Sequence, residues 1–135
     1  MMIADGSSAV AAAVDVPIQT GENLPNPLEF QKALKAKAAD FYMLDIQRIA
    51  GVSGWRAAIT LPEAESIPVS THLFPKISIH LMATTNNAGW FEYVDWASPV
   101  IREPIVASDG KVQVPTTVGN GIEWDDEAVV RYRGE

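Results

Sequence analysis

Short apolar segments recur along the chain, and a polar residue stands at or just beyond the end of each one. Continuous apolar runs, unlike strictly alternating ones, are typical of buried parallel strands. The polar residues are 20 to 27 positions apart, which is the length of a strand plus its crossover helix. The pattern therefore predicts four strands at residues 16–19, 41–44, 67–70 and 90–91, followed by Glu22, Asp45, His72 and Glu92.

Stretches with helical periodicity lie between these strands. The first helix is expected to begin at Pro27, behind Asn26 as the N-cap. The third is expected at residues 75–84, where apolar side chains occupy most positions. The second is expected at residues 55–64, after a glycine-containing loop and with a break at Pro62, because proline disrupts a helix interior.

Two further stretches do not fit the strand and helix repeat. Residues 7–14 are small and apolar but lack the basic flank of a signal peptide, so we interpret them as the last turns of a helix whose preceding strand is missing. Beyond residue 98 the chain is rich in proline, glycine and β-branched residues, and Asp109 with Gly110 predicts a hairpin turn. This part is not another strand and helix unit.

Composition narrows the classes of function. The chain has 47% hydrophobic and 20% charged residues, and it contains no apolar run close to the roughly 20 residues of a membrane span. A formal net charge of -7 and scattered basic residues argue against nucleic acid as a partner. The absence of cysteine excludes disulfides, thiolate zinc sites and thiol catalysis, and is compatible with the cytoplasm, where we expect the protein.

One histidine and three carboxylates at successive strand ends form a candidate site. A single carboxylate after a strand is more often a helix cap, but in a (β/α)8 barrel all strand ends converge on one mouth. Such a set could supply a base, an acid that orients it and a ligand for a hard cation, as proton abstraction beside a carboxylate requires. His80, within the third helix, is interpreted instead as a packed, hydrogen-bonded structural histidine.

The segments PIQTGEN, MLDIQRIAGVSGW, STHLF and WFEYVDW resemble successive strand ends of the mandelate racemase subgroup of the enolase superfamily. The resemblance implies an α/β fold, the carboxyl-terminal half of a (β/α)8 barrel. Residues 1–98 would hold strands five to eight. Residues 99–135 would form an irregular or β extension, which in the family packs on the capping domain.

The resemblance also implies a role for each strand-end residue. Glu22 would be one of three carboxylate ligands of Mg²⁺. His72 would be the general base or acid, hydrogen-bonded to Asp45, and Glu92 would hydrogen-bond the substrate carboxylate and stabilise the enolate. Muconate-cycloisomerase-like relatives carry a lysine on the strand of Asp45, so a racemase-type pair is favoured.

The family's capping domain, its first four strands, a second-strand lysine and two metal carboxylates have no counterpart in this sequence. We therefore expect the chain to be inactive alone, and to pair with a second copy or with a polypeptide carrying the missing half. Locally, Ala50 replaces a glycine that is usual in relatives, and Pro62 interrupts a helix.

Three functions stay open at this point. The first is part of a Mg²⁺-dependent racemase or dehydratase that abstracts the α-proton of an α-hydroxy acid or sugar acid. The second is a truncated, non-catalytic remnant or interaction module of the same family. The third is an unrelated acidic domain that binds cations, which would bind metal independently of Asp45 and His72.

Overall fold

Strands and helices alternate along the first part of the chain, as the sequence pattern predicts. The computed structural model describes residues 3–134. The elements are α1 (Ile3–Ala13), β1 (Gln19–Thr20), α2 (Pro27–Lys35), β2 (Phe41–Asp45), α3 (Gly51–Ala64), β3 (Val69–His72), α4 (Pro75–Met82), a 3-10 helix η1 (Ser98–Val100), β4 (Ala107–Ser108), β5 (Lys111–Val112) and α5 (Asp126–Tyr132). Among these residues, no helix has the length and apolar character needed to cross a membrane.

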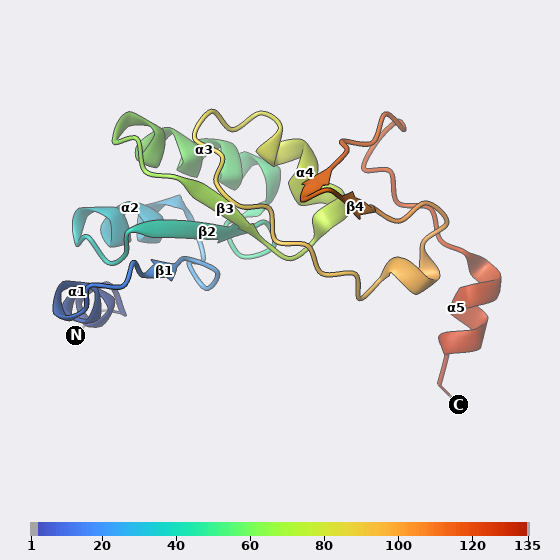
Figure 1. Cartoon of the computed structure of the whole chain (residues 1–135), viewed down its shortest axis with the longest axis horizontal. Coiled ribbons are helices and arrows are strands. Elements are labelled where there is room, and N and C mark those ends of the chain that lie inside the picture. Colours follow the sequence, from blue (N-terminus) through green and yellow to red (C-terminus); the bar gives the residue numbers. More distant parts are fainter. Residues whose placement is uncertain (1–2, 135) are drawn as a thin grey trace.

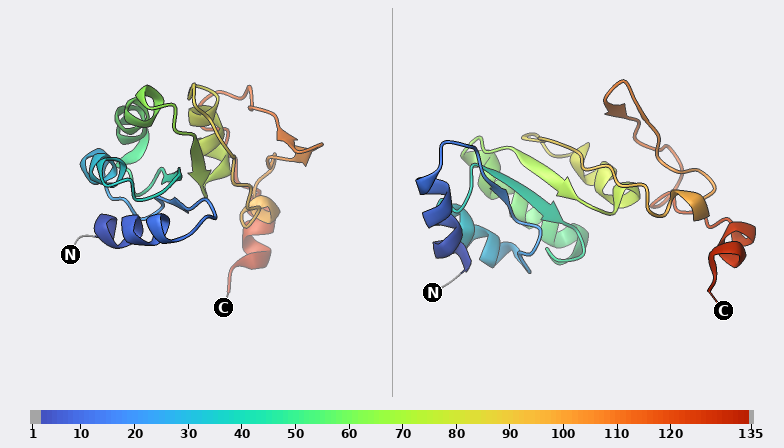
Figure 2. Two further views of the ribbon diagram at one scale, coloured as in Figure 1. Left: turned by 60° about the vertical axis from the view of Figure 1, so that its left-hand side comes forward. Right: turned by 60° about the horizontal axis from the view of Figure 1, so that its bottom comes forward.

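Strands β1, β2 and β3 form one parallel sheet in that order (Figure 1). Gln19 is paired with Phe41, and at the far end of the sheet Asp45 is paired with His72. Asp45 and His72 are thus the last residues of neighbouring parallel strands, and their side chains leave the sheet at the same edge. The helices lie in an arc outside the sheet (Figure 2), the arrangement of a partial (β/α)8 barrel.

The hydrophobic core lies between the sheet and the helices. Tyr42, Leu44 and Trp55 have no exposed surface, and the rings of Phe30 and Tyr42 meet edge to face with centroids 5.2 Å apart. On the opposite face of β2, 37% of the surface of Phe41 is exposed. The apolar run predicts a strand covered on both faces, whereas the described residues cover this strand fully on the helix side only.

Helix α2 begins as predicted. The Asn26 side chain accepts a hydrogen bond from the Glu29 backbone N–H at 2.9 Å, and Pro27 occupies the first turn, where its missing N–H costs nothing. The predicted cap at Asn26 is therefore confirmed.

Helix α3 differs from the prediction at both ends. It begins at Gly51, so that the two glycines expected in a loop lie in its first turn. Gly54 is required there, because a Cβ at this position would stand 1.7 Å from the Ile49 carbonyl oxygen. The expected break at Pro62 is also wrong, since the helix continues to Ala64. Pro62 lies in the last turn, and its side chain is fully buried.

The predicted strand at residues 90–91 is not formed as a regular strand. Residues 87–92 do run beside β3, since Gly89 N–H donates to Val69 at 2.7 Å and Thr71 N–H donates to Trp90 at 3.1 Å. However, Trp90 N–H donates to the Ser70 hydroxyl and Glu92 N–H to the Thr71 hydroxyl. The bridge between Val69 and Ala88 is not extended into a regular ladder, since Thr71 N–H bonds to Trp90 in place of Gly89.

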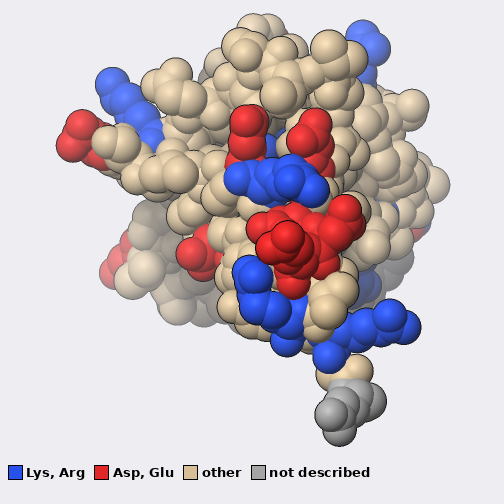
Figure 3. All heavy atoms as spheres, turned by 90° about the vertical axis from the view of Figure 1, so that its right-hand side faces the viewer, with Lys and Arg blue, Asp and Glu red and all other residues tan. Residues whose placement is uncertain are grey.

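The carboxyl-terminal extension contains the predicted hairpin. β4 and β5 pair antiparallel, and Asp109 and Gly110 between them have φ values of 51° and 72°, as a tight two-residue hairpin turn requires. The extension includes α5, and Asp126 of this helix forms an exposed ion pair with Arg102 at 3.8 Å. Viewed from this end of the molecule, acidic and basic side chains lie side by side (Figure 3).

Candidate acid-base and metal-ligand site

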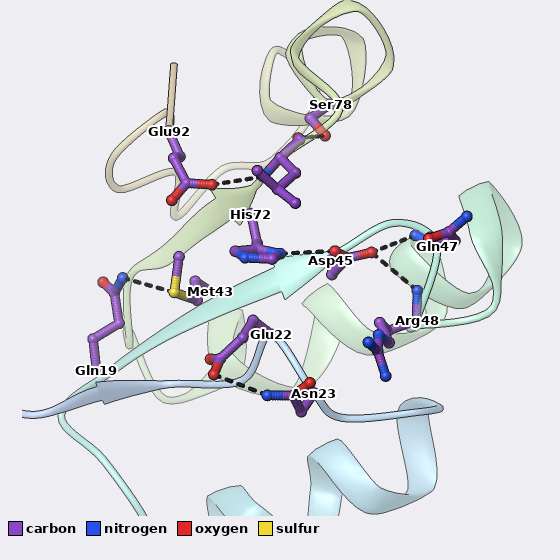
Figure 4. Close-up of polar contacts among 11 residues, drawn as sticks. Gln19, Glu22, Asn23, Met43, Asp45, Gln47, Arg48, His72, Ser78 and Glu92 are labelled. Atoms are coloured by element: carbon purple, nitrogen blue, oxygen red, sulfur yellow. Dashed lines mark hydrogen bonds and ion pairs between the residues drawn. The ribbon is translucent and has the colours of Figure 1, made fainter. Parts of the chain in front are cut away.

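Asp45 and His72 form a hydrogen-bonded pair at the carboxyl ends of β2 and β3. The His72 Nδ1 and Asp45 Oδ2 atoms are 2.7 Å apart (Figure 4). The Asp45 carboxylate is almost fully buried, and the His72 ring is partly exposed. The strand register alone brings the two residues together, since each is paired with the other in the parallel ladder.

The second carboxylate oxygen of Asp45 is also occupied. Oδ1 accepts hydrogen bonds from the backbone N–H groups of Gln47 at 2.7 Å and Arg48 at 3.1 Å. When the Asp45 carboxylate is ionised it only accepts hydrogen bonds, so a neutral His72 ring bonded to it carries its hydrogen on Nδ1 and leaves the lone pair of Nε2 free. The pair is therefore arranged to take up a proton at His72 Nε2.

Glu92 lies close to His72, on the segment that runs beside β3 (Figure 4). Its Oε2 accepts the Leu73 N–H at 2.7 Å, and its own N–H donates to the Thr71 hydroxyl at 2.8 Å. The carboxyl group is thus tied to the residue that follows His72. Sequence reasoning identified Glu92 but missed Thr71 and the hydrogen bond to Leu73. The signal available in the sequence was a hydroxyl-bearing residue directly before the candidate base.

Glu22 follows β1 and lies at the same end of the sheet as the pair (Figure 4). Its Oε1 accepts a hydrogen bond from the Asn23 side chain at 3.1 Å. Gly21, with a φ of 133°, brings this turn close to β2, because a Cβ there would stand 2.4 Å from the Met43 carbonyl oxygen. The glycine before Glu22 is therefore needed for β1 to end against β2.

The donor type of Glu22 suits Mg²⁺, which prefers carboxylate oxygens. Among the described side chains, no three His, Cys, Asp or Glu residues are grouped so that they could hold a metal ion. Glu22 therefore stands as a single candidate ligand.

His80 is only partly as predicted. It is packed in α4, but its buried Nε2 has no hydrogen-bond partner among the described residues. The prediction of a hydrogen-bonded structural histidine is wrong in that respect. His80 is not part of the strand-end site.

An apolar pocket of about 320 Å³ lies between α4 and the carboxyl-terminal extension. Its lining includes Phe74, two residues after His72, and the aromatic residues Tyr93, Trp96 and Trp124. Trp96 is 77% exposed and Trp124 54% exposed. This surface is unusually apolar for one open to solvent.

The fold and site define a class: an α/β partial barrel with a carboxylate–histidine pair at neighbouring strand ends. Comparison with known proteins gives the family. A family model described as "Enolase C-terminal domain-like" matches residues 2–128, and the chain belongs to this family. The mandelate-racemase-type resemblance of the sequence motifs and the predicted fold class are thereby confirmed.

Two solved structures have folds that closely match the fold of this chain. An enolase from alpha pretobacterium bal199, with bound magnesium, is 40% identical, with a TM-score of 0.90 over 96% of this chain and 36% of that one. An enolase from Bradyrhizobium, complexed with magnesium and mandelic acid, is 35% identical, with a TM-score of 0.91 over 98% of this chain and 37% of that one.

One curated relative is a dehydratase. L-talarate/galactarate dehydratase from Salmonella typhimurium is 27% identical over 124 residues, covering 92% of this chain and 31% of the relative. The chain thus spans about a third of the length of the proteins it matches.

Proposed function

We propose that this chain supplies the acid-base part of a Mg²⁺-dependent racemase or dehydratase that acts on an α-hydroxy acid or sugar acid. The observation that carries the proposal is the 2.7 Å hydrogen bond between His72 Nδ1 and Asp45 Oδ2 at adjoining strand ends. Family membership and magnesium-bound neighbours support it.

In this reaction His72 removes the α-proton of the substrate carboxylate. The proton moves to Nε2, because Nδ1 is held by Asp45. The imidazolium that forms lies against the buried, ionised Asp45, which stabilises its positive charge. In a dehydration, His72 can return the proton to the departing β-hydroxyl; in a racemisation, a proton is returned to the opposite face.

Glu92 is proposed to stabilise the enolate. Since Oε2 already accepts the Leu73 N–H, a protonated Glu92 carries its hydrogen on Oε1. That hydrogen can be donated to the substrate carboxylate oxygen on which negative charge develops. Glu22 is proposed as one magnesium ligand, and we expect the remaining ligands to come from other polypeptide.

Association with further polypeptide is therefore part of the proposal. The sheet ends at β1 on one side, and its inner face at Phe41 is open. Trp90, Trp96 and Trp124 are 82%, 77% and 54% exposed. Either a polypeptide that supplies the first four strands or a second copy of this chain would cover these surfaces.

The test is reconstitution. The 135-residue chain is mixed with Mg²⁺ and a panel of mandelate and sugar acids, alone and with the amino-terminal portion of the bal199 enolase. We expect turnover only in the mixture, reduced about 10²–10⁴-fold by His72→Asn. His80→Asn is the matched control, since it removes the other histidine of the chain, outside the site, and should retain turnover.

The second candidate is a non-catalytic interaction module, favoured by the incomplete metal site. It predicts that the chain binds the amino-terminal portion without turnover of any acid. Turnover that His72→Asn and His80→Asn reduce equally would contradict the proposed role of His72. Light scattering on the chain alone separates the two kinds of association, because a stable dimer indicates a second copy.

A further inference from the structure

The turn that follows His72 has an unusual backbone. Leu73 and Phe74 both have left-handed conformations, with φ values of 52° and 49°. Neither is a glycine, asparagine or aspartate, the residues that tolerate this region best. Two bulky residues in succession keep such a conformation only when surrounding groups hold it.

Both polar backbone groups of Leu73 are held by side chains. Its N–H donates to Glu92 Oε2 at 2.7 Å, and its carbonyl oxygen accepts from the Ser78 hydroxyl at 2.9 Å. Ser78 N–H also donates to the Phe74 carbonyl at 2.9 Å. Ser78 therefore contacts both residues of the turn, and Figure 4 shows Ser78 on α4 next to this connection.

The Ser78 hydroxyl does not donate its hydrogen bond to a carbonyl of its own helix. A serine inside a helix usually bonds the carbonyl three or four residues earlier. Here the acceptor is five residues earlier, outside α4 and next to the base. Ser78 has no exposed surface, so water cannot readily replace its hydroxyl.

We propose that Ser78 is a positioning residue for His72. By fixing the Leu73 carbonyl it sets the backbone from which the His72 ring departs, so that Nδ1 meets Asp45 and Nε2 is directed to the substrate. Glu92 fixes the same residue from its N–H side. The inference rests on the proposed function in that His72 is taken as the base, but its test needs no turnover.

The test is NMR of the 135-residue chain labelled with ¹⁵N-histidine. The chain has two histidines, so the His72 signals are readily distinguished. We expect Ser78→Ala to shift the Nδ1–H proton resonance of His72 upfield or to remove it through faster exchange with solvent. An unchanged His72 resonance in a folded Ser78→Ala chain overturns the proposal.

Thr84→Ala is the matched control. Thr84 donates to the Leu81 carbonyl at 2.9 Å, the same length as the Ser78 bond, just beyond the other end of α4. It should leave the His72 resonance unchanged; an equal shift in both variants overturns the proposal in favour of a general effect on the helix.

A conservative variant keeps the test decisive if Ser78→Ala does not fold. Ser78→Cys has a similar shape but a weak donor, and should shift the His72 resonance in the same direction. Ser78→Thr keeps the hydroxyl and should restore the wild-type resonance; failure of both outcomes overturns the inference. Because the readout is the His72 hydrogen bond, absence of turnover in the reconstituted enzyme would count against the proposed function only.

Discussion

Replacing Ala50 with glycine, which has more backbone freedom, should stabilise the fold. Ala50 precedes α3 with φ 73° and ψ 41°, and its side chain caps nothing. The left-handed conformation costs an alanine roughly 1–2 kcal/mol, while a glycine there loses roughly 0.5–1 kcal/mol of extra chain entropy on folding. The Ala50 side chain is exposed, so its removal uncovers no core. Ala50→Gly should therefore raise the free energy of unfolding by about 0.5–1 kcal/mol.

A matched substitution in the same helix should have the opposite sign. Ala57 is also exposed but lies inside α3, where glycine costs about 1 kcal/mol. Urea unfolding followed by circular dichroism gives both values. With a slope of about 2 kcal/mol per molar urea, Ala50→Gly should raise the midpoint by about 0.3–0.5 M and Ala57→Gly should lower it by about 0.5 M. If both lower it equally, the left-handed strain at Ala50 is refuted.

Three further predictions concern buried or close-packed positions. Gly54→Ala places a Cβ 1.7 Å from the Ile49 carbonyl oxygen, and should lower the free energy of unfolding by about 1–3 kcal/mol; an unchanged urea midpoint contradicts this. Gly21→Ala should displace the turn that carries Glu22, seen as amide shift changes centred on Met43, whose carbonyl oxygen is 2.4 Å from the added Cβ. Burial raises the pKa of Tyr42 above its ordinary value of 10.0, so the folded chain keeps a proton that the unfolded chain releases. The contribution of this group to the free energy of unfolding is therefore fully present below about pH 10 and is lost as the pH rises further. The loss should be smaller in Tyr42→Phe. Unfolding of both chains at about pH 8 and about pH 11 measures the difference.

The sequence predicted best what depends on local chemistry. The cap at Asn26 and the turn at Asp109 and Gly110 follow from residue types at fixed offsets, and both are confirmed. The pairing of Asp45 with His72 was implied by the family resemblance, and the parallel register brings them together. The roles of all four strand-end residues, and the division at residue 98, stay predictions.

The features that sequence reasoning missed depend on contacts between distant parts of the chain. In the sequence, Gly54 suggests a loop. In the structure it lies in a helix, where the carbonyl of Ile49 occupies the space that a side chain would need. The segment at residue 90 suggests a strand, but its Trp90 and Glu92 N–H groups donate to the hydroxyls of Ser70 and Thr71 and no regular ladder forms. Neither contact has a signature in composition or periodicity.

The three hydrogen bonds at Asp45 also decide where a cation can settle at this edge of the sheet. A divalent ion that approached Asp45 would compete with His72 Nδ1 on one oxygen and with two backbone N–H groups on the other. Glu22 is bonded to a single exposed amide, which can rotate away. Of these two carboxylates, Glu22 is therefore the one that a cation could bind with less competition, which agrees with the separate roles proposed for them.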